Sequence, residues 1–245
     1  MVGFAMTDLF EAGDILSEYV GYGAVRQDGL FDNKLSALTG MLPERLRTTP
    51  PHAYRSLTLS AHEHAALMDG SPLVLRPRLF GSWTRDEAAA YRITRGRVAR
   101  LKEAEVAVLI RKALPPGCVI ADVEAVYLDL GWNDESLECW SRYASWEREL
   151  IVCQPAGLLT VRTADVVRWH APGDLAALAP VPGERAYSAD GGEWIIIGSV
   201  PDLQPDAASG VWAVAADGKD TLTPVFWNWR QETWDMADAD PAWEP

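Results

Sequence analysis

The sequence lacks any long apolar run, and this absence excludes a membrane-spanning helix. No stretch of the 245 residues approaches the roughly twenty consecutive apolar residues that a bilayer span requires. The opening segment Met1–Met6 also lacks the basic start and long apolar run of a signal peptide. We therefore expect a cytoplasmic protein with no membrane partner, or one in the cytoplasm of a host cell if it is delivered there.

Metal-binding spacing is also missing. The three cysteines, Cys118, Cys139 and Cys153, are odd in number and show no Cys-x-x-Cys spacing. The run 62–64 reads His-Glu-His, but alternate residues of a predicted helix diverge, so a polar helix surface is favoured over a metal site. We expect free thiols and no metal cofactor.

Basic residues are scarce, with 22 Lys and Arg against 35 Asp and Glu, a net charge of −13. This balance disfavours general nucleic-acid binding through a basic surface. The acidic excess is uneven, because residues 184–245 hold 12 acidic and only 3 basic residues. The cationic side chains instead gather in one short stretch, which fits either an anionic small ligand or a solvated, salt-bridged helix and loop; they are Arg76, Arg78, Arg85, Arg92, Arg95, Arg97, Arg100 and Lys102.

The pattern of apolar residues predicts an α+β fold. Two helices come first, one starting at Thr7 or Asp8 and one over 34–42 capped by Asp32 or Asn33. Short apolar runs follow, interrupted by an alanine-rich helix over 85–93. These predicted strands do not alternate regularly with helices, which argues against a doubly wound sheet. The predicted strands cover 53–59, 73–80, 106–110, 119–126 and 150–152.

A domain boundary is expected near residue 183, where Ala, Pro and Gly dominate. We assign 1–183 to a main domain and 184–245 to an acidic, tryptophan-rich β extension. Strands over 194–200, 211–215 and 221–229, with a tight turn at Asp217-Gly218, predict a small β meander. Its tryptophans could form a stacking platform, but packing of a short sheet is the favoured role.

A Glu-x-Glu pair precedes the predicted strand at 150–152. Strand alternation places Glu147 and Glu149 on one face, with their α-carbons roughly 6 to 7 Å apart. Two carboxylates at that separation raise at least one pKa, which suits a site where one group stabilises positive charge and the other accepts a proton. The alternative is a solvated strand edge neutralised by Arg148.

Two further elements lie upstream in a suggestive order. Arg55 is on the predicted strand 53–59, and a Ser82-x-Thr84 sequence leads into the alanine-rich helix. This trio of arginine, serine and Glu-x-Glu resembles the arginine–serine–glutamate class of ADP-ribosyltransferases, which includes clostridial-type and cholera-type toxins and phage enzymes. The resemblance spans roughly 19–167. It implies an ADP-ribosyltransferase-like split β-sandwich with N-terminal helices, here followed by the small β meander.

The resemblance implies that NAD is the substrate and that Arg55 holds its phosphates or nicotinamide ribose. Ser82 is expected to hydrogen-bond Glu149 and fix its rotamer, and Thr84 to support the strand. Ser56 stands where the family usually has glycine, which limits how closely the backbone approaches the carboxamide but leaves main-chain hydrogen bonding open. Trp83 is a bulky residue in the middle of the serine motif.

Other contacts to NAD are expected on the same grounds. One of Phe80, Trp83 and Tyr91 would pack on the nicotinamide ring, the others being core residues. The basic stretch 94–102 matches in position the family's flexible loop over the nicotinamide and phosphates. Its candidate diphosphate contacts are Arg95, Arg97 and Arg100.

By the same resemblance, Glu149 is the catalytic carboxylate that stabilises the oxocarbenium-like sugar left when nicotinamide departs. Glu147 would position or deprotonate the acceptor, and glutamate at this position goes with guanidinium acceptors in the family. Transfer to a protein arginine is therefore expected. The segment 131–146 would recognise the target through exposed aromatics, with Trp132, Trp140, Tyr143 and Trp146 as candidates.

Other functions stay open at the level of the sequence. An NAD glycohydrolase would use water as the acceptor on the same scaffold. A nucleic-acid ADP-ribosyltransferase is disfavoured by the net charge, although the acidic excess lies mainly in the extension. A non-catalytic acidic inhibitor would use the tryptophan-rich extension to engage a basic partner. The setting is open too, whether a phage protein, an injected effector or a toxin with an antitoxin.

Overall fold

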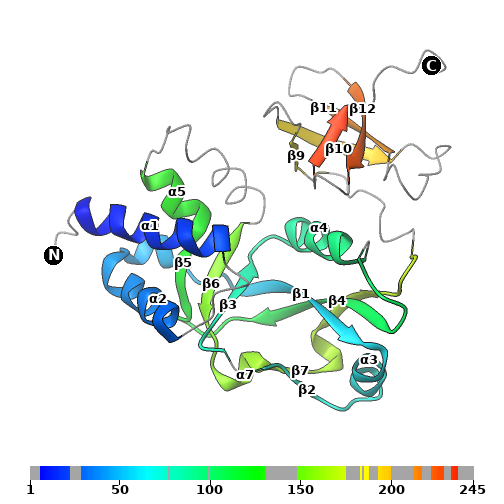
Figure 1. The fold of residues 1–245 in the computed structure, drawn as a ribbon, viewed down its shortest axis with the longest axis horizontal. Helices are drawn as coiled ribbons and strands as arrows, with labels where there is room; N and C mark the ends of the chain where they lie inside the picture. The colour runs from blue at the N-terminus through cyan, green and yellow to red at the C-terminus, as the bar shows by residue number, and fades with distance from the viewer. Residues whose placement is uncertain are drawn as a thin grey trace.

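The computed structural model describes residues 6–22, 29–76, 78–98, 100–130, 148–174, 183, 185–187, 193–199, 212–216, 222–228 and 233–236. Within these ranges helices combine with a six-stranded, a five-stranded and a two-stranded sheet (Figure 1). The α+β class predicted from the sequence is confirmed. Among the described helices we find none with the length and apolar character that a bilayer crossing demands.

The larger sheet has the strand order β5-β6-β3-β1-β4-β8, and each of its pairings is antiparallel. β4 is buried on both faces over Val106–Ile110, as a central strand covered on both sides should be. The six strands are β1 (His52–Ser60), β3 (Phe80–Thr84), β4 (Glu105–Ala113), β5 (Val119–Asp122), β6 (Glu149–Cys153) and β8 (Val166–His170).

In the middle of this sheet, β1 and β3 are aligned over a very short length. β1 pairs with β4 along its whole length, and β3 pairs with β6 along its whole length. Between β1 and β3, in contrast, the described register aligns a single pair, Tyr54 opposite Thr84. The sheet therefore consists of two halves, β5-β6-β3 and β1-β4-β8, that meet at this pair. We call the junction the seam.

Helices cover the sheet beside the seam. α1 (Met6–Tyr22), α2 (Gly29–Met41) and α5 (Val123–Leu130) lie together next to β5 and β6, where Leu16 and Leu38 share an apolar core with Ile151 (Figure 1). α4 (Glu87–Val98) lies over β1 and β4, and its Tyr91 packs on Leu109. Burial of these apolar side chains is the main favourable contribution to folding.

α3 (Ala61–Met68) follows β1 without a loop. Ser60 and Glu63 form a capping box, in which the Ser60 side chain accepts from the Glu63 backbone and the Glu63 carboxylate accepts from the Ser60 backbone. The Ser60 backbone N–H and hydroxyl both donate to the Glu63 carboxylate, and these hydrogen bonds lower the pKa of Glu63. The remaining short elements are η1 (Glu44–Arg47), β2 (Leu73–Val74), α7 (Ala156–Leu159), β7 (Thr160–Val161) and η3 (Thr163–Asp165).

Two predicted helices have different bounds in the structure. α2 begins at Gly29 rather than after Asp32 or Asn33, and Asp32 lies in its first turn, where a carboxylate favours the positive end of the helix dipole. α4 runs on from the predicted 85–93 to Val98. The expected loop 94–102 is therefore wrong over 94–98, because the helix continues to bury Val98 against Ala107.

Two predicted strands are also corrected. The run 73–80 is not one strand, since β2 ends at Val74 and β3 begins at Phe80; Pro77 between them has no N–H to give to a sheet. The run 119–126 changes from β5 to α5 at Val123. There the Asp122 carboxylate accepts a hydrogen bond from Ala125 N–H at 3.2 Å, which is a helix cap.

The second sheet confirms the predicted β meander. Its order is β13-β12-β11-β10-β9, so sequential strands are neighbours, and its edge strands β9 and β13 also contact each other. The turn predicted at Asp217-Gly218 lies outside the described residues. The strands are β9 (Arg185–Tyr187), β10 (Glu193–Ser199), β11 (Trp212–Ala216), β12 (Leu222–Asn228) and β13 (Thr233–Met236).

Candidate active site

The three strands that carry the motif residues are immediate neighbours in the sheet, in the order β6-β3-β1. Thr84 is aligned with Tyr54 on β1 and with Glu149 on β6, so the three residues form one row across the seam. Arg55 follows Tyr54 directly. Residues that are 94 positions apart in the chain, Arg55 and Glu149, are thus brought to the same junction.

Glu149 is the first residue of β6 and is buried, with 6 % of its surface exposed. Directly opposite residues of an antiparallel pair share a face, so Glu149 shares its face with the buried Thr84. Ser82 is exposed and lies opposite Ile151, two residues further along. The hydroxyl residue directly across from Glu149 is therefore Thr84, while Ser82 is its diagonal neighbour.

The Arg55 guanidinium has neutral partners. Its Nη1 donates a hydrogen bond of 2.7 Å to Gln154 Oε1, and its Cζ lies 5.7 Å from the centroid of the Trp83 ring. Burial lowers the pKa of Arg55, and the charges of Arg78 and Arg97 lower it further, while Tyr19 acts in the opposite direction. Burial disfavours a charged group, so this cation is held in a partly desolvated position.

The face of the sheet on which Arg55 lies follows from strand alternation. Trp83 and Thr84 are successive residues of β3, so their side chains point to opposite faces of the sheet. Tyr54 shares the Thr84 face, and Arg55 is the next residue of β1, so Arg55 points to the Trp83 face. Its guanidinium contacts Trp83 and Gln154 there.

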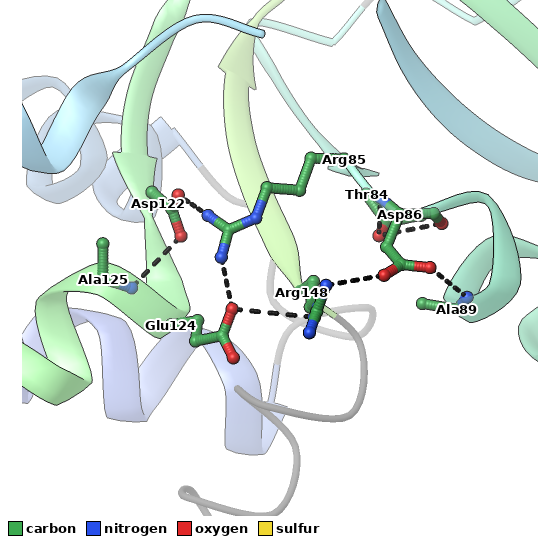
Figure 2. Close-up of polar contacts among 8 residues, drawn as sticks. All are labelled: Thr84, Arg85, Asp86, Ala89, Asp122, Glu124, Ala125 and Arg148. Atoms are coloured by element: carbon green, nitrogen blue, oxygen red, sulfur yellow. Dashed lines mark hydrogen bonds and ion pairs between the residues drawn. The ribbon is translucent and has the colours of Figure 1, made fainter. Parts of the chain in front are cut away.

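A group of charged residues surrounds the entrance to β6 (Figure 2). Arg85 pairs with Asp122 and Glu124, and Arg148 pairs with Asp86 at 2.8 Å and with Glu124 at 3.8 Å. We call these five residues the ion-pair cluster. It joins the end of β3, the start of α5 and the residue directly before Glu149, and it contains one carboxylate more than it has arginines.

The ion-pair cluster also begins two helices. Asp86 accepts a hydrogen bond of 3.0 Å from Ala89 N–H and so caps α4, as Asp122 caps α5 (Figure 2). The Thr84 hydroxyl accepts from Asp86 N–H at 3.2 Å. Thr84, which lies opposite Glu149, is therefore tied to the same cap.

Arg148 has an unusual backbone. Its φ is +44°, in the left-handed region that costs a residue with a Cβ about 1 kcal/mol. Its carbonyl oxygen accepts from Arg85 N–H at 3.4 Å, and its side chain is held by Asp86 and Glu124. Such a conformation persists where its surroundings enforce it. The direction in which the chain enters β6 at Glu149 is fixed by these contacts.

The remaining predicted contact residues are placed as follows. Arg95 is part of α4 and only 1 % exposed, so it does not belong to an exposed loop. Arg97 is exposed and donates to Thr58 Oγ1 at 3.4 Å. Ser56 is buried on β1, and among the described residues its hydroxyl has no hydrogen-bond partner. Arg100 is exposed just after α4.

The three aromatic residues expected near the nicotinamide ring lie in the core. Phe80, Trp83 and Tyr91 are all buried, each in an apolar cluster of the core. The Tyr91 ring has the guanidinium carbons of Arg95 and Arg168 at 5.7 and 5.1 Å. Glu147 and the segment 131–146 lie outside the described residues.

Gln154 is the residue of this region that sequence reasoning missed. It follows β6 directly and is buried at 7 % exposure, although glutamine is usually exposed. A polar residue at the end of the apolar run 150–153 was the available signal. Its contact with Arg55 joins positions that are distant in the chain, so no local pattern predicts it.

Metal ligands and known relatives add no further assignment. In the described ranges, no group of three or more His, Cys, Asp or Glu side chains is arranged to hold a metal ion. Comparison of the chain with family models, with curated proteins and with solved structures gave no significant match.

Proposed function

We propose that this protein is an NAD-dependent mono-ADP-ribosyltransferase that modifies a macromolecule, with protein arginine as the preferred acceptor. One observation carries the proposal: Arg55, Thr84 and Glu149 lie on three adjacent strands beside the seam of the sheet. The two halves of the sheet with their single aligned pair support an ADP-ribosyltransferase-like split β-sandwich in 1–183, with the meander as a separate unit.

Arg55 would bind the diphosphate of NAD. A planar guanidinium offers several fixed N–H donors to phosphate oxygens, and burial strengthens such charge-assisted hydrogen bonds. In the described part of the chain no carboxylate pairs with Arg55, so its charge is available to an anion. Arg97, whose charge acts on Arg55, and Arg100, which is exposed just after α4, would add positive potential.

Glu149 would stabilise the reacting sugar. Departure of nicotinamide leaves an oxocarbenium-like ribose, and a carboxylate held rigidly beside it lowers the energy of that transition state. The ion-pair cluster, through Arg148, provides this rigidity. Glu147 would position or deprotonate the acceptor, as the Glu-x-Glu sequence indicates.

A labelling experiment tests the proposal. Purified protein is incubated with NAD labelled in the adenylate part and with a cell lysate, and protein is then separated from RNA and DNA. We expect label on protein, reduced about 10²- to 10³-fold by Glu149→Gln, which preserves shape but removes the stabilising charge. Nucleic-acid labelling would instead identify a nucleic-acid transferase.

The other outcomes separate the remaining functions. Release of free ADP-ribose without labelled protein or nucleic acid would identify an NAD glycohydrolase. No NAD turnover, together with tight binding of a basic protein to the acidic extension, would identify an inhibitor or antitoxin-like partner instead of an enzyme. Glu147→Ala should suppress transfer while some NAD hydrolysis remains; equal loss of both would contradict the division of labour between the two glutamates.

A further inference from the structure

Gln154 connects three parts of the candidate site. Its Oε1 accepts from Arg55 Nη1 at 2.7 Å and from Trp83 Nε1 at 3.4 Å. Its Nε2 donates to the carbonyl oxygen of Arg78 at 3.4 Å, and its backbone N–H donates to Leu79 O at 2.9 Å. Both ends of the amide are therefore used, which fixes which end faces Arg55.

Gly81 makes room for this amide. A Cβ at position 81 would lie 2.4 Å from Gln154 Cδ and 2.5 Å from its Oε1, closer than any real side-chain contact. The Gln154 side chain thus lies directly against the β3 backbone. We call Arg55, Gly81, Trp83 and Gln154 the amide cluster.

The neutrality of Gln154 matters for charge. A buried arginine is usually paired with a carboxylate, which compensates its charge. Here the close partner is an amide oxygen, which orients the guanidinium without neutralising it. The nearby charges of Arg78 and Arg97 increase the positive potential around Arg55.

We propose that Gln154 is a positioning residue that holds Arg55 as an oriented, uncompensated cation for the diphosphate of a dinucleotide. The orientation comes from the short Nη1–Oε1 hydrogen bond and the Trp83 ring beneath. The remaining N–H groups of Arg55 are left for phosphate oxygens. This inference rests on the proposed function for the identity of the ligand, but the anion site itself does not require turnover.

The experiment compares Gln154→Glu with Gln154→Met. The glutamate has the same size and places a carboxylate on Arg55, whereas methionine keeps the length and neutrality and removes the acceptor. We expect Gln154→Glu to raise the KM for NAD at least about 10-fold and to change kcat less than about 2-fold, since Arg55 does not touch the reacting bond. Gln154→Met should raise KM less, about 3-fold.

Calorimetric titration with inorganic pyrophosphate provides a readout without turnover. Pyrophosphate should bind the wild type and Gln154→Met, and binding should be lost in Gln154→Glu. Asn33→Asp, on the exposed side of α2, makes the same change in net charge and should leave binding and KM unchanged. Melting temperatures establish that each variant is folded.

The outcomes divide cleanly. Pyrophosphate binding that Gln154→Glu abolishes, without any NAD turnover by the wild type, would support the anion site and overturn only the proposed transferase. Equal binding by the wild type and Gln154→Glu, or no binding by the wild type, overturns the inference. So does a parallel fall of kcat and stability in both Gln154 variants with KM unchanged, which a merely structural role predicts.

Discussion

The two clusters beside the seam use arginine in opposite ways. In the amide cluster, Arg55 lies against a neutral glutamine and an aromatic ring, and its charge stays uncompensated. In the ion-pair cluster, Arg85 and Arg148 are matched by three carboxylates, two of which also cap helices (Figure 2). A compensated charge holds structure in place, while an uncompensated one favours binding of an external anion.

The largest effect is expected when the ion-pair cluster is broken at Arg148. Arg148→Ala removes the cation that pairs with Asp86 and leaves Arg85 as the partner of both Asp122 and Glu124. Removing one partner from a buried pair costs 3–5 kcal/mol, and these side chains are 12 to 30 % exposed, so we expect a loss of about 2 to 3 kcal/mol. Urea unfolding measures it, and kcat should fall because Glu149 is no longer held.

Arg45→Ala is the matched control. Arg45 pairs with Asp129 at 2.7 Å, but its side chain is 64 % exposed. An exposed pair of this kind contributes under about 1 kcal/mol. If the two variants lost equal stability, the ion-pair cluster would be an ordinary surface feature and the contrast with the amide cluster would fail.

The next effect concerns packing in the amide cluster. Gly81→Ala forces Gln154 away from β3, because the new methyl group would overlap its amide. Overpacking of this kind costs typically 1–3 kcal/mol, and we expect about 1 to 2 here, measured by thermal unfolding. Gly40→Ala, in α2 with nothing within 4 Å of its new Cβ, should instead be neutral or stabilising.

A smaller effect separates backbone from charge at Arg148. Both Arg148→Gly and Arg148→Ala remove the ion pairs, but only glycine adopts φ of +44° without steric cost. We expect the free energy of unfolding, measured in urea, to be about 1 kcal/mol higher for Arg148→Gly than for Arg148→Ala. A glycine variant less stable than the alanine variant would mean that the left-handed backbone does not survive loss of the side chain.

The sequence predicted several of the main strands well, because a short apolar run is a local pattern. The apolar runs that became β1, β4 and β6 have strand length, and Arg55 lies on the predicted strand 53–59. The predicted strands 73–80 and 150–152 did not include Thr84, the last residue of β3, or Glu149, the first residue of β6. The change from β5 to α5 was missed, since it depends on a cap by Asp122 inside an apolar run. Residues 94–98 were missed because their helix is set by burial of Val98.

The parts that could not be predicted depend on contacts between distant residues. Nothing local reveals that β1 and β3 align at one pair, or that Gln154 reaches Arg55 across β3. The ion-pair cluster likewise draws on positions from 85 to 148. Motif spacing therefore pointed to residues on three strands that prove to be adjacent, whereas the partners of these residues became visible only in the structure.

The smallest effect is expected at Tyr54, which lies in the seam between the two clusters and belongs to neither. Its hydroxyl donates to Glu87 at 3.1 Å at an exposed position, so Tyr54→Phe should cost under about 0.5 kcal/mol at neutral pH.

Burial and the Glu87 carboxylate raise the pKa of Tyr54, which means that the folded state holds the phenol proton more tightly. The stability difference between wild type and Tyr54→Phe should therefore be constant well below about pH 10 and should shrink as pH rises through the raised pKa. Urea unfolding of both proteins at about pH 8 and about pH 11 measures it, and a difference that grows with pH would contradict the assigned hydrogen bond.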